Sequence, residues 1–205
     1  PPRYRFADIY LCPGTIAPPR LSEQQNITFG LNAPIETLRK TYSENHRRTL
    51  KKTDLAASGW EQRLSVAELT AFLIGSEQFK RWGIKPDQVH TLLRVLGVAE
   101  DHGHGFGCGV RSEGELVCAA YFIRWGGRLI FLKGLANEQG RKVHSMHYLI
   151  DRVIAEHAGQ DLLFDFAGTN DPELARFYMG FGGERSVYLR ALVNKLPFPL
   201  KLLRT

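Results

Sequence analysis

The spacing of hydrophobic residues predicts several helices. Within residues 86–101, apolar side chains recur at Val89, Leu92, Leu93 and Leu96, which lie on one face of a helix. Ser65 and Glu68 have the spacing of a capping box and predict the start of another helix. The same period predicts helices over residues 34–53, between residues 140 and 159, and from residue 172 to 181.

Other stretches have the pattern of strands. Residues 106–133 contain three apolar runs, which are separated by turn residues at 112–114 and 126–127. This pattern predicts an antiparallel meander with residues 116–123 as its central strand. Further strands are predicted over residues 4–11, 27–31, 60–64, 161–166 and 184–193.

Counted from Trp60, the predicted order is β α α β β β α β α β, an α/β (α+β) domain with a mixed, mostly antiparallel sheet. We assign this domain to residues 59–195 and a basic connecting helix to 34–53. Residues 1–33 are too few to form a domain and are interpreted as linker strands or the tail of a preceding unit. Residues 196–205 are interpreted as a C-terminal tail.

Composition narrows the class of protein. The chain has 205 residues, of which 43% are hydrophobic and 23% charged, which is typical of a globular protein. It contains neither an apolar run long enough for a membrane helix nor a secretory signal, so we expect a cytoplasmic protein without membrane contact. The three cysteines lack disulfide or zinc spacing. A net charge of +6 is compatible with nucleic acid, an anionic cofactor or an acidic substrate. The chain begins at Pro1 and not at Met, so we expect either a processed protein or a segment of a longer one, and the segment is favoured.

Three strings sharpen the interpretation. Residues 175–182 (ARFYMGFG) resemble the end of the penultimate helix of GNAT acyltransferases, and residues 164–168 (FDFAG) resemble a strand end of their FemAB-like members. Residues 42–52 resemble the basic helix that precedes the second GNAT unit of those bacterial proteins. The resemblance implies a GNAT fold and transfer of an acyl or aminoacyl group to an amine. It also implies that residues 1–33 correspond to the tail of a first unit.

The resemblance also implies a donor site. GNAT enzymes bind the pyrophosphate of acyl-CoA at a glycine-containing turn that opens a helix, because free backbone N–H groups and the helix dipole favour an anion there. This chain retains the central Gly140, followed by two cations. The residues expected to bind acetyl-CoA or another acyl-CoA are Lys133, Gly134, Gly140, Arg141, Lys142, Val143, His144 and Asn170. Because Phe177-Tyr178 replaces the Phe-Lys pair of FemAB members that use aminoacyl-tRNA, tRNA is the less favoured donor.

Two residues are candidates for catalysis. Tyr178 occupies the position where GNAT enzymes place a tyrosine near the thioester sulfur, so it is the candidate general acid; the alternative is a half-buried tyrosine at a helix end. Leu174, Phe177 and Phe181 are expected to form the buried stripe of its helix, which leaves Tyr178 at the margin. Asp165 is expected to face away from its two phenylalanine neighbours, as a base or amine anchor or as a structural hydrogen-bond acceptor near the helix that starts at Asn170. A backbone N–H within residues 132–135 would stabilise the oxyanion.

Several histidines have either a ligand-binding role or an ordinary packing role as alternatives. His147 shares the apolar face of its helix, so a core histidine is favoured over a ligand-binding pair with His144. His102 and His104 with Cys108 lie in a glycine-rich stretch that favours a turn, and we expect no metal. The basic run of residues 46–52 is compatible with a phosphate or tRNA contact, but a solvated helix face is favoured.

The leading hypothesis is therefore an N-acyltransferase that moves an acyl group from an acyl-CoA-like donor to the amine of a small molecule or amino-sugar. An aminoacyl transferase that uses charged tRNA in cell-wall peptide synthesis is the second hypothesis. A degenerate GNAT fold that serves as a binding module is the third.

Overall fold

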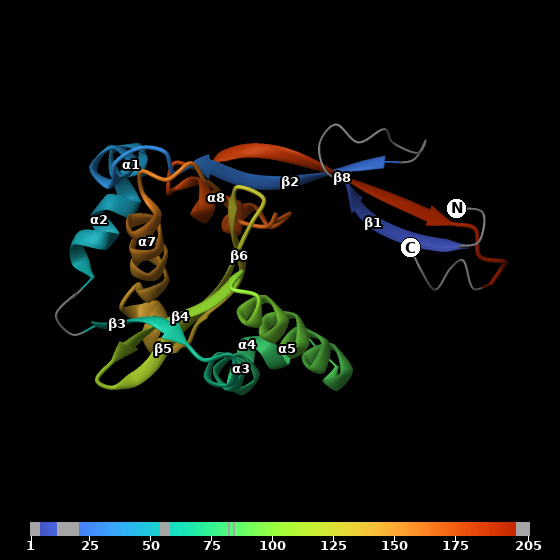
Figure 1. Cartoon of the computed structure of the whole chain (residues 1–205), viewed down its shortest axis with the longest axis horizontal. Helices are drawn as coiled ribbons and strands as arrows, with labels where there is room; N and C mark the ends of the chain where they lie inside the picture. The colour runs from blue at the N-terminus through green and yellow to red at the C-terminus, as the bar shows by residue number, and fades with distance from the viewer. Residues whose placement is uncertain (1–4, 12–20, 54–57, 82, 84, 200–205) are drawn as a thin grey trace.

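A computed structural model describes residues 5–11, 21–53, 58–81, 83 and 85–199. Its centre is one eight-stranded sheet in the order β1-β8-β2-β7-β6-β5-β4-β3 (Figure 1). All neighbouring strands are antiparallel except β6 and β7, which are parallel. The strands are β1 (Phe6–Leu11), β2 (Leu21–Gly30), β3 (Ser58–Leu64), β4 (Gly105–Ser112), β5 (Glu115–Trp125), β6 (Arg128–Ala136), β7 (Leu163–Asp165) and β8 (Glu184–Asn194). The predicted mixed, mostly antiparallel α/β class is confirmed.

Helices cover both faces of this sheet. One group packs on β4 and β5 around Leu69, Leu73 and Leu96, and the other packs on the opposite face around Leu149 and Val153. The first group is α3 (Val66–Gly75), α4 (Glu77–Arg81) and α5 (Pro86–Asp101). The second group is α1 (Ile35–Thr41), α2 (Glu44–Lys52), α6 (Glu138–Lys142), α7 (Ser145–His157) and α8 (Pro172–Met179).

Most predicted elements are found, because their signals are local. The Ser65 hydroxyl accepts a hydrogen bond from the Glu68 N–H at the start of α3, as the capping box predicts. The meander forms β4, β5 and β6, and the central β5 is buried over most of its length. The short helices α4 and α6 were not predicted. Strand β6 continues to Ala136, beyond the end of the meander predicted at residue 133.

The single helix predicted over residues 34–53 is wrong, since the structure has two helices with a break at Tyr42 and Ser43. Tyr42 is extended and buried against Phe181, and the Ser43 hydroxyl caps α2 by accepting from the His46 N–H. The Ser43 N–H donates to the Gly180 carbonyl. The break therefore lets the chain anchor itself to the end of α8. Pro34 occupies the N-cap position of α1.

The N-terminal strands belong to the same sheet as the predicted 59–195 domain. Strand β2 lies between β7 and β8 and pairs with both, and β1 pairs with the far half of β8 (Figure 1). Residues 21–30 are thus the strand that joins β7 to β8, rather than a linker outside the domain. In the predicted tail, residues 196–199 form no helix or strand, and residues 200–205 lie outside the described residues.

Candidate functional site

The sheet divides where β6 and β7 separate. These parallel strands pair only from Arg128 and Leu163 to Ile130 and Asp165. Beyond that point the chain follows β2, because the Phe166 N–H donates to the Ile27 carbonyl and the Thr169 N–H to the Gln25 carbonyl. Strand β6 remains paired with β5. The separation opens a cleft between neighbouring strands in the middle of the sheet.

A β-bulge lies at the edge of this cleft. The register between β5 and β6 shifts so that Tyr121 lies opposite Lys133, whereas Phe122 lies opposite Phe131. Leu132 is therefore the extra residue on β6. A bulge leaves the extra residue unpaired in the ladder and redirects the strand, so it places main-chain groups within the predicted 132–135 segment at the cleft.

The cleft has a volume of about 270 Å³ and is lined by β6, the turn after β7, α7 and α8. From the predicted site, it contains Lys133, Gly134 and Tyr178. Burial lowers the pKa of the Lys133 ammonium. Gly134 leaves room for the Phe131 ring, because a Cβ there would lie 2.4 Å from that ring. The remaining lining residues are Phe131, Leu132, Met146, Phe166, Ala167, Gly168, Leu174 and Phe177.

Tyr178 is fixed by aromatic contacts. Its ring stacks on Phe166, with 4.1 Å between the centroids and 14° between the planes, and its edge contacts Phe131. The side chain is 5% exposed. Burial, followed by the charge of Asp171, raises the pKa of the Tyr178 hydroxyl, so this group stays protonated at neutral pH. The structure thus places the Tyr178 side chain, with a protonated hydroxyl group, among the residues that line the cleft.

The expected buried stripe of α8 is found in part: Phe181 is buried as predicted, but the rest of the stripe is shifted by one position. Ala175 and Tyr178 are the buried residues of this helix, whereas Leu174 is 38% exposed at the rim of the cleft and Phe177 is half-buried. Both stripes have helical spacing, so the helix period alone did not distinguish them. The stacking of Tyr178 on Phe166 turns the helix toward this face.

Asp165 faces away from Phe164 and Phe166, as predicted, but it does not line the cleft. One carboxylate oxygen accepts from the Asn26 amide and from the Ala167 N–H, both at 2.8 Å, and the other accepts from Arg128 at 2.7 Å. Three of its roughly four lone-pair positions therefore have structural partners. The structure corrects the catalytic assignment of Asp165 and supports its structural alternative, with Ala167 instead of the Asn170 helix as the partner.

The predicted pyrophosphate cradle is not formed. The N–H of Gly140 donates to the Asn137 side chain, and the N–H groups of Arg141, Val143 and His144 donate to carbonyls of the same turn. These groups are not available to an anion in this conformation. Gly140 has a packing reason instead, because a Cβ there would lie 2.2 Å from the Val117 carbonyl oxygen.

The side chains near this turn also have hydrogen-bond or ion-pair partners. Arg141 donates to the Ala136 carbonyl, and Lys142 pairs with Glu138 at 2.9 Å on the surface. Asn170, which was assigned to the donor site, donates instead to the Gln24 side chain. None of these three residues lines the cleft.

His147 packs as a core histidine, which was the favoured interpretation. Its ring lies 4.6 Å from the ring of His46 and 4.8 Å from that of Phe177. Burial, with the nearby His46 and His144, lowers the pKa of His147 to about 4. His46 is buried, and its ring nitrogens contact the Phe177 carbonyl and the Ser43 hydroxyl. The pair therefore fastens α2 to α7 and α8.

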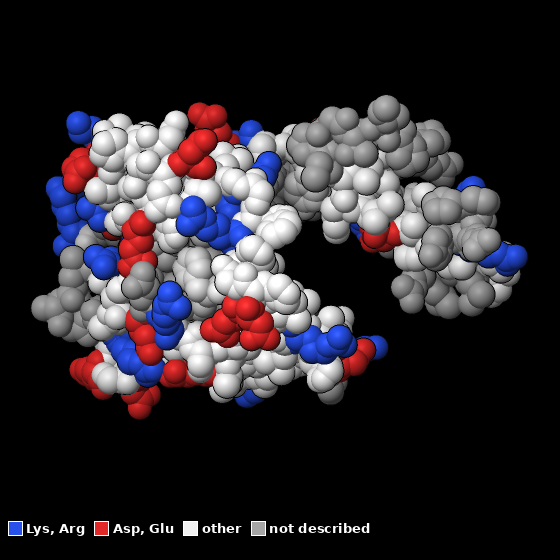
Figure 2. Space-filling view, viewed as in Figure 1, with Lys and Arg blue, Asp and Glu red and all other residues white. Residues whose placement is uncertain are grey.

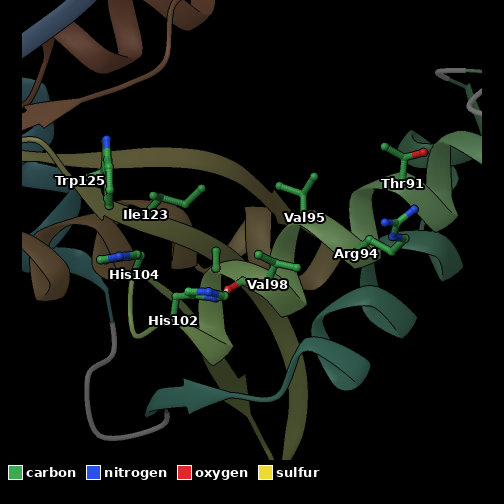
Figure 3. Close-up of a pocket in the computed structure, with 9 residues that line it drawn as sticks. Thr91, Arg94, Val95, Val98, His102, His104, Ile123 and Trp125 are labelled. Carbon is green, nitrogen blue, oxygen red and sulfur yellow. Dashed lines mark hydrogen bonds between the residues drawn. The ribbon is translucent and has the colours of Figure 1, made fainter.

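An apolar groove near α5 was not predicted. It has a volume of about 700 Å³, and Figure 3 shows Val95, Val98 and Trp125 along it together with His102 and His104. The exposure of these three apolar side chains, from 48% to 63%, is not visible in the sequence. The two histidines thus line a groove, while Cys108 is buried in the core. Over the described part of the chain, no group of three metal-ligating side chains is found.

No helix among the described residues is both long and apolar enough to cross a bilayer.

A scan against protein-family models found no match to the sequence, and a search of curated proteins found none either.

Solved structures do match the fold. FemX superposes with a TM-score of 0.66 at 14% identity, over 88% of this chain and 63% of the FemX chain. A conserved protein of unknown function from Bacteroides thetaiotaomicron VPI-5482 gives 0.55 at 9% identity, over 86% and 64%. A protein from Novosphingobium aromaticivorans DSM 12444, assigned to the GNAT acetyltransferases, gives 0.50 at 17% identity, over 95% and 77%. The chain therefore spans less than two thirds of the length of FemX, and it shares the fold of these three structures.

Proposed function

We propose that this chain is an N-acyltransferase that moves an acyl group from an acyl-CoA-like thioester to the amine of a small molecule. One observation carries the proposal: Tyr178 and the residues of the β6 bulge, Leu132 and Lys133, line the same cleft. A proton donor and main-chain groups therefore meet at the point where the sheet opens. The same N-acyltransferase activity is proposed for any longer protein that contains this chain.

The proposed reaction begins with attack of a neutral amine on the thioester carbonyl. Negative charge develops on the carbonyl oxygen, and a main-chain N–H of β6 near Leu132 would stabilise it. As the carbon–sulfur bond breaks, Tyr178 gives its proton to the thiolate, and the hydroxyl regains the proton that the attacking nitrogen releases. The products are an amide and a free thiol, so atoms and charge balance.

The cleft fits only part of an acyl-CoA. Its volume of about 270 Å³ accommodates an acyl group and the adjoining thioester. The turn expected to hold the pyrophosphate has its N–H groups bonded internally. Acyl-CoA binding by the predicted residues would therefore rest on Lys133 and Gly134 in the cleft and on the side chains of Arg141 and Lys142.

The occupied cradle favours a second candidate, an aminoacyl transferase that uses charged tRNA. An aminoacyl ester carries no pyrophosphate, so it does not need the N–H groups of residues 140–144. The fold match to FemX is compatible with this candidate, although it bears on the fold alone.

Titration calorimetry with acetyl-CoA, combined with a gel-shift assay with bulk tRNA, separates the two candidates. The leading proposal expects saturable acetyl-CoA binding and release of free thiol when a panel of primary amines is added. Binding of tRNA without acetyl-CoA binding would establish the second candidate. Failure to bind either would contradict both.

A further inference from the structure

Another pocket lies on the other side of α7 from the cleft that contains Tyr178. It has a volume of about 530 Å³ and lies between α1, α2 and α7. It shares no lining residue with the cleft. Four cationic side chains line it, one or two from each helix: Arg39, Arg47, Lys51 and Arg152.

Arg152 has a buried atom without a partner. Its Nε is buried and has no hydrogen-bond partner among the described residues. Tyr42 is 2% exposed, and its hydroxyl lies beside the Asp151 carboxylate; burial first, then the charge of Asp151 and a hydrogen bond to it, raise the pKa of this hydroxyl. Both residues line the pocket, but these two atoms are covered by the protein in this conformation, so the charged ends of the four cations, rather than these atoms, would meet a ligand.

The pocket also carries an excess of positive charge. Its one carboxylate, Asp151, is held by Arg39 through two hydrogen bonds of 2.9 and 2.6 Å. Arg47 and Lys51 have no ion-pair partner in the described part of the chain. Figure 2 shows Lys and Arg side chains gathered at the end of the molecule that α1 and α2 form. The pocket is therefore positive at its mouth after the Arg39–Asp151 pair is counted.

Arg152 is positioned by its neighbours. Its guanidinium lies 5.8 Å from the centroid of the Trp60 ring, and one terminal nitrogen is 3.9 Å from Glu156. The Trp60 indole N–H donates to the same Glu156 oxygen at 2.9 Å. These contacts hold the guanidinium at the wall of the pocket, while its Nε remains without a partner.

We propose that this pocket binds a phosphorylated small molecule of about nucleotide size. Guanidinium groups and a lysine suit phosphate oxygens. The volume exceeds that of a single phosphate and falls within the usual range for small-molecule pockets. Tyr42 and Tyr148 supply aromatic surface beside the cations, which suits a ligand with both a phosphate and a ring.

The geometry separates this proposal from a general basic surface. Arg48 and Lys52 belong to the same helix as Arg47 and Lys51, with the same spacing and charge, but they do not line the pocket. Arg48 lies instead 3.8 Å from Glu44 on the exposed side. Binding of a ligand inside the pocket should depend on Arg47 and Lys51 and not on Arg48 and Lys52. A diffuse electrostatic attraction should depend equally on both pairs.

Titration calorimetry with ADP and with pyrophosphate as probes tests the proposal. The wild-type protein is expected to bind ADP with a Kd below about 1 mM. Arg47→Ala with Lys51→Ala should weaken binding at least about tenfold, while Arg48→Ala with Lys52→Ala should change it less than about twofold.

Thermal unfolding of each variant provides the folding control, and all four substituted cations are exposed. Equal losses in the two double variants would overturn the proposal in favour of non-specific attraction. Binding of bulk tRNA that depends equally on both pairs would replace it with an extended nucleic-acid surface. Absence of ADP and pyrophosphate binding to the folded wild-type protein would also overturn it. Acetyl-CoA turnover by the Arg47 and Lys51 double variant should match that of wild type, so failure of this proposal is distinct from failure of the proposed function.

Discussion

Phe166 and Tyr178 stack with their ring centroids 4.1 Å apart, and this contact joins the end of β7 to α8 at the cleft. The two residues lie 12 positions apart in the chain, and both line the cleft. The position of the candidate acid therefore depends on a ring that itself carries no reactive group.

Replacement of Phe166 tests this dependence. Phe166→Leu removes the stacked ring from a fully buried site, so we expect a loss of about 1–2 kcal/mol in the free energy of unfolding. The turnover rate should fall more than donor affinity does, because a loosened Tyr178 is a poorly placed acid. Urea denaturation and steady-state kinetics measure the two effects. Unchanged turnover in a measurably destabilised protein would show that the stack has no part in positioning.

Tyr178→Phe keeps the stack and removes only the hydroxyl. We expect kcat to fall about 100-fold or more while the melting temperature changes little. Tyr10→Phe, in a tyrosine that is 61% exposed on β1, provides a matched control and should behave as wild type. Activity of the Tyr178 variant within a few-fold of wild type would remove Tyr178 from the mechanism.

Asp165→Asn tests a structural role. The substitution weakens the contacts to Arg128, Asn26 and the Ala167 N–H, so the protein should lose about 1–3 kcal/mol of stability. At a temperature where the variant is folded, its kcat should stay within a few-fold of wild type. A loss of kcat of about 100-fold with full stability would instead restore Asp165 as a catalytic group.

Arg141→Ala with Lys142→Ala probes the turn after β6. Because its N–H groups are bonded internally and the two side chains are exposed, we expect acetyl-CoA affinity to fall only about two- to fivefold, with a strong dependence on salt. Calorimetry at two ionic strengths measures this. A loss of about 100-fold would indicate that the turn rearranges to bind the pyrophosphate directly.

The histidine pair predicts a dependence of stability on pH. The pKa of His147 is lowered to about 4 in the folded state from an unfolded value of 6.5, and that of His46 is also lowered. The unfolded chain therefore binds more protons between these values. Stability is complete above pH 6.5 and should fall by about 1–2 kcal/mol toward pH 4, after allowance for partial exposure. His147→Leu should reduce this slope in denaturation experiments, and an unchanged slope would assign it to other groups.

Elements with local signals could be predicted from the sequence. Ser65 and Glu68 lie three residues apart and cap α3 as predicted, and the glycine turns at 114 and 126–127 separate the strands of the meander. The resemblance also placed Tyr178 at the cleft. In each case the information lies within a few residues or in a short string. Backbone geometry and hydrophobic period act over that range, so the sequence alone determined these elements.

Tertiary structure decided which distant groups became neighbours. Asn26 bonds to Asp165 across 139 positions, and β2 enters the sheet between β7 and β8. No local pattern specifies such a partner, because the backbone groups of a strand can form hydrogen bonds with any free sheet edge of matching length. The same holds for Gly140. Its sequence context resembles a phosphate-binding turn, but in the structure this glycine packs against Val117. The free energy that selects among these pairings comes from burial and hydrogen bonds that exist only once the whole sheet has formed.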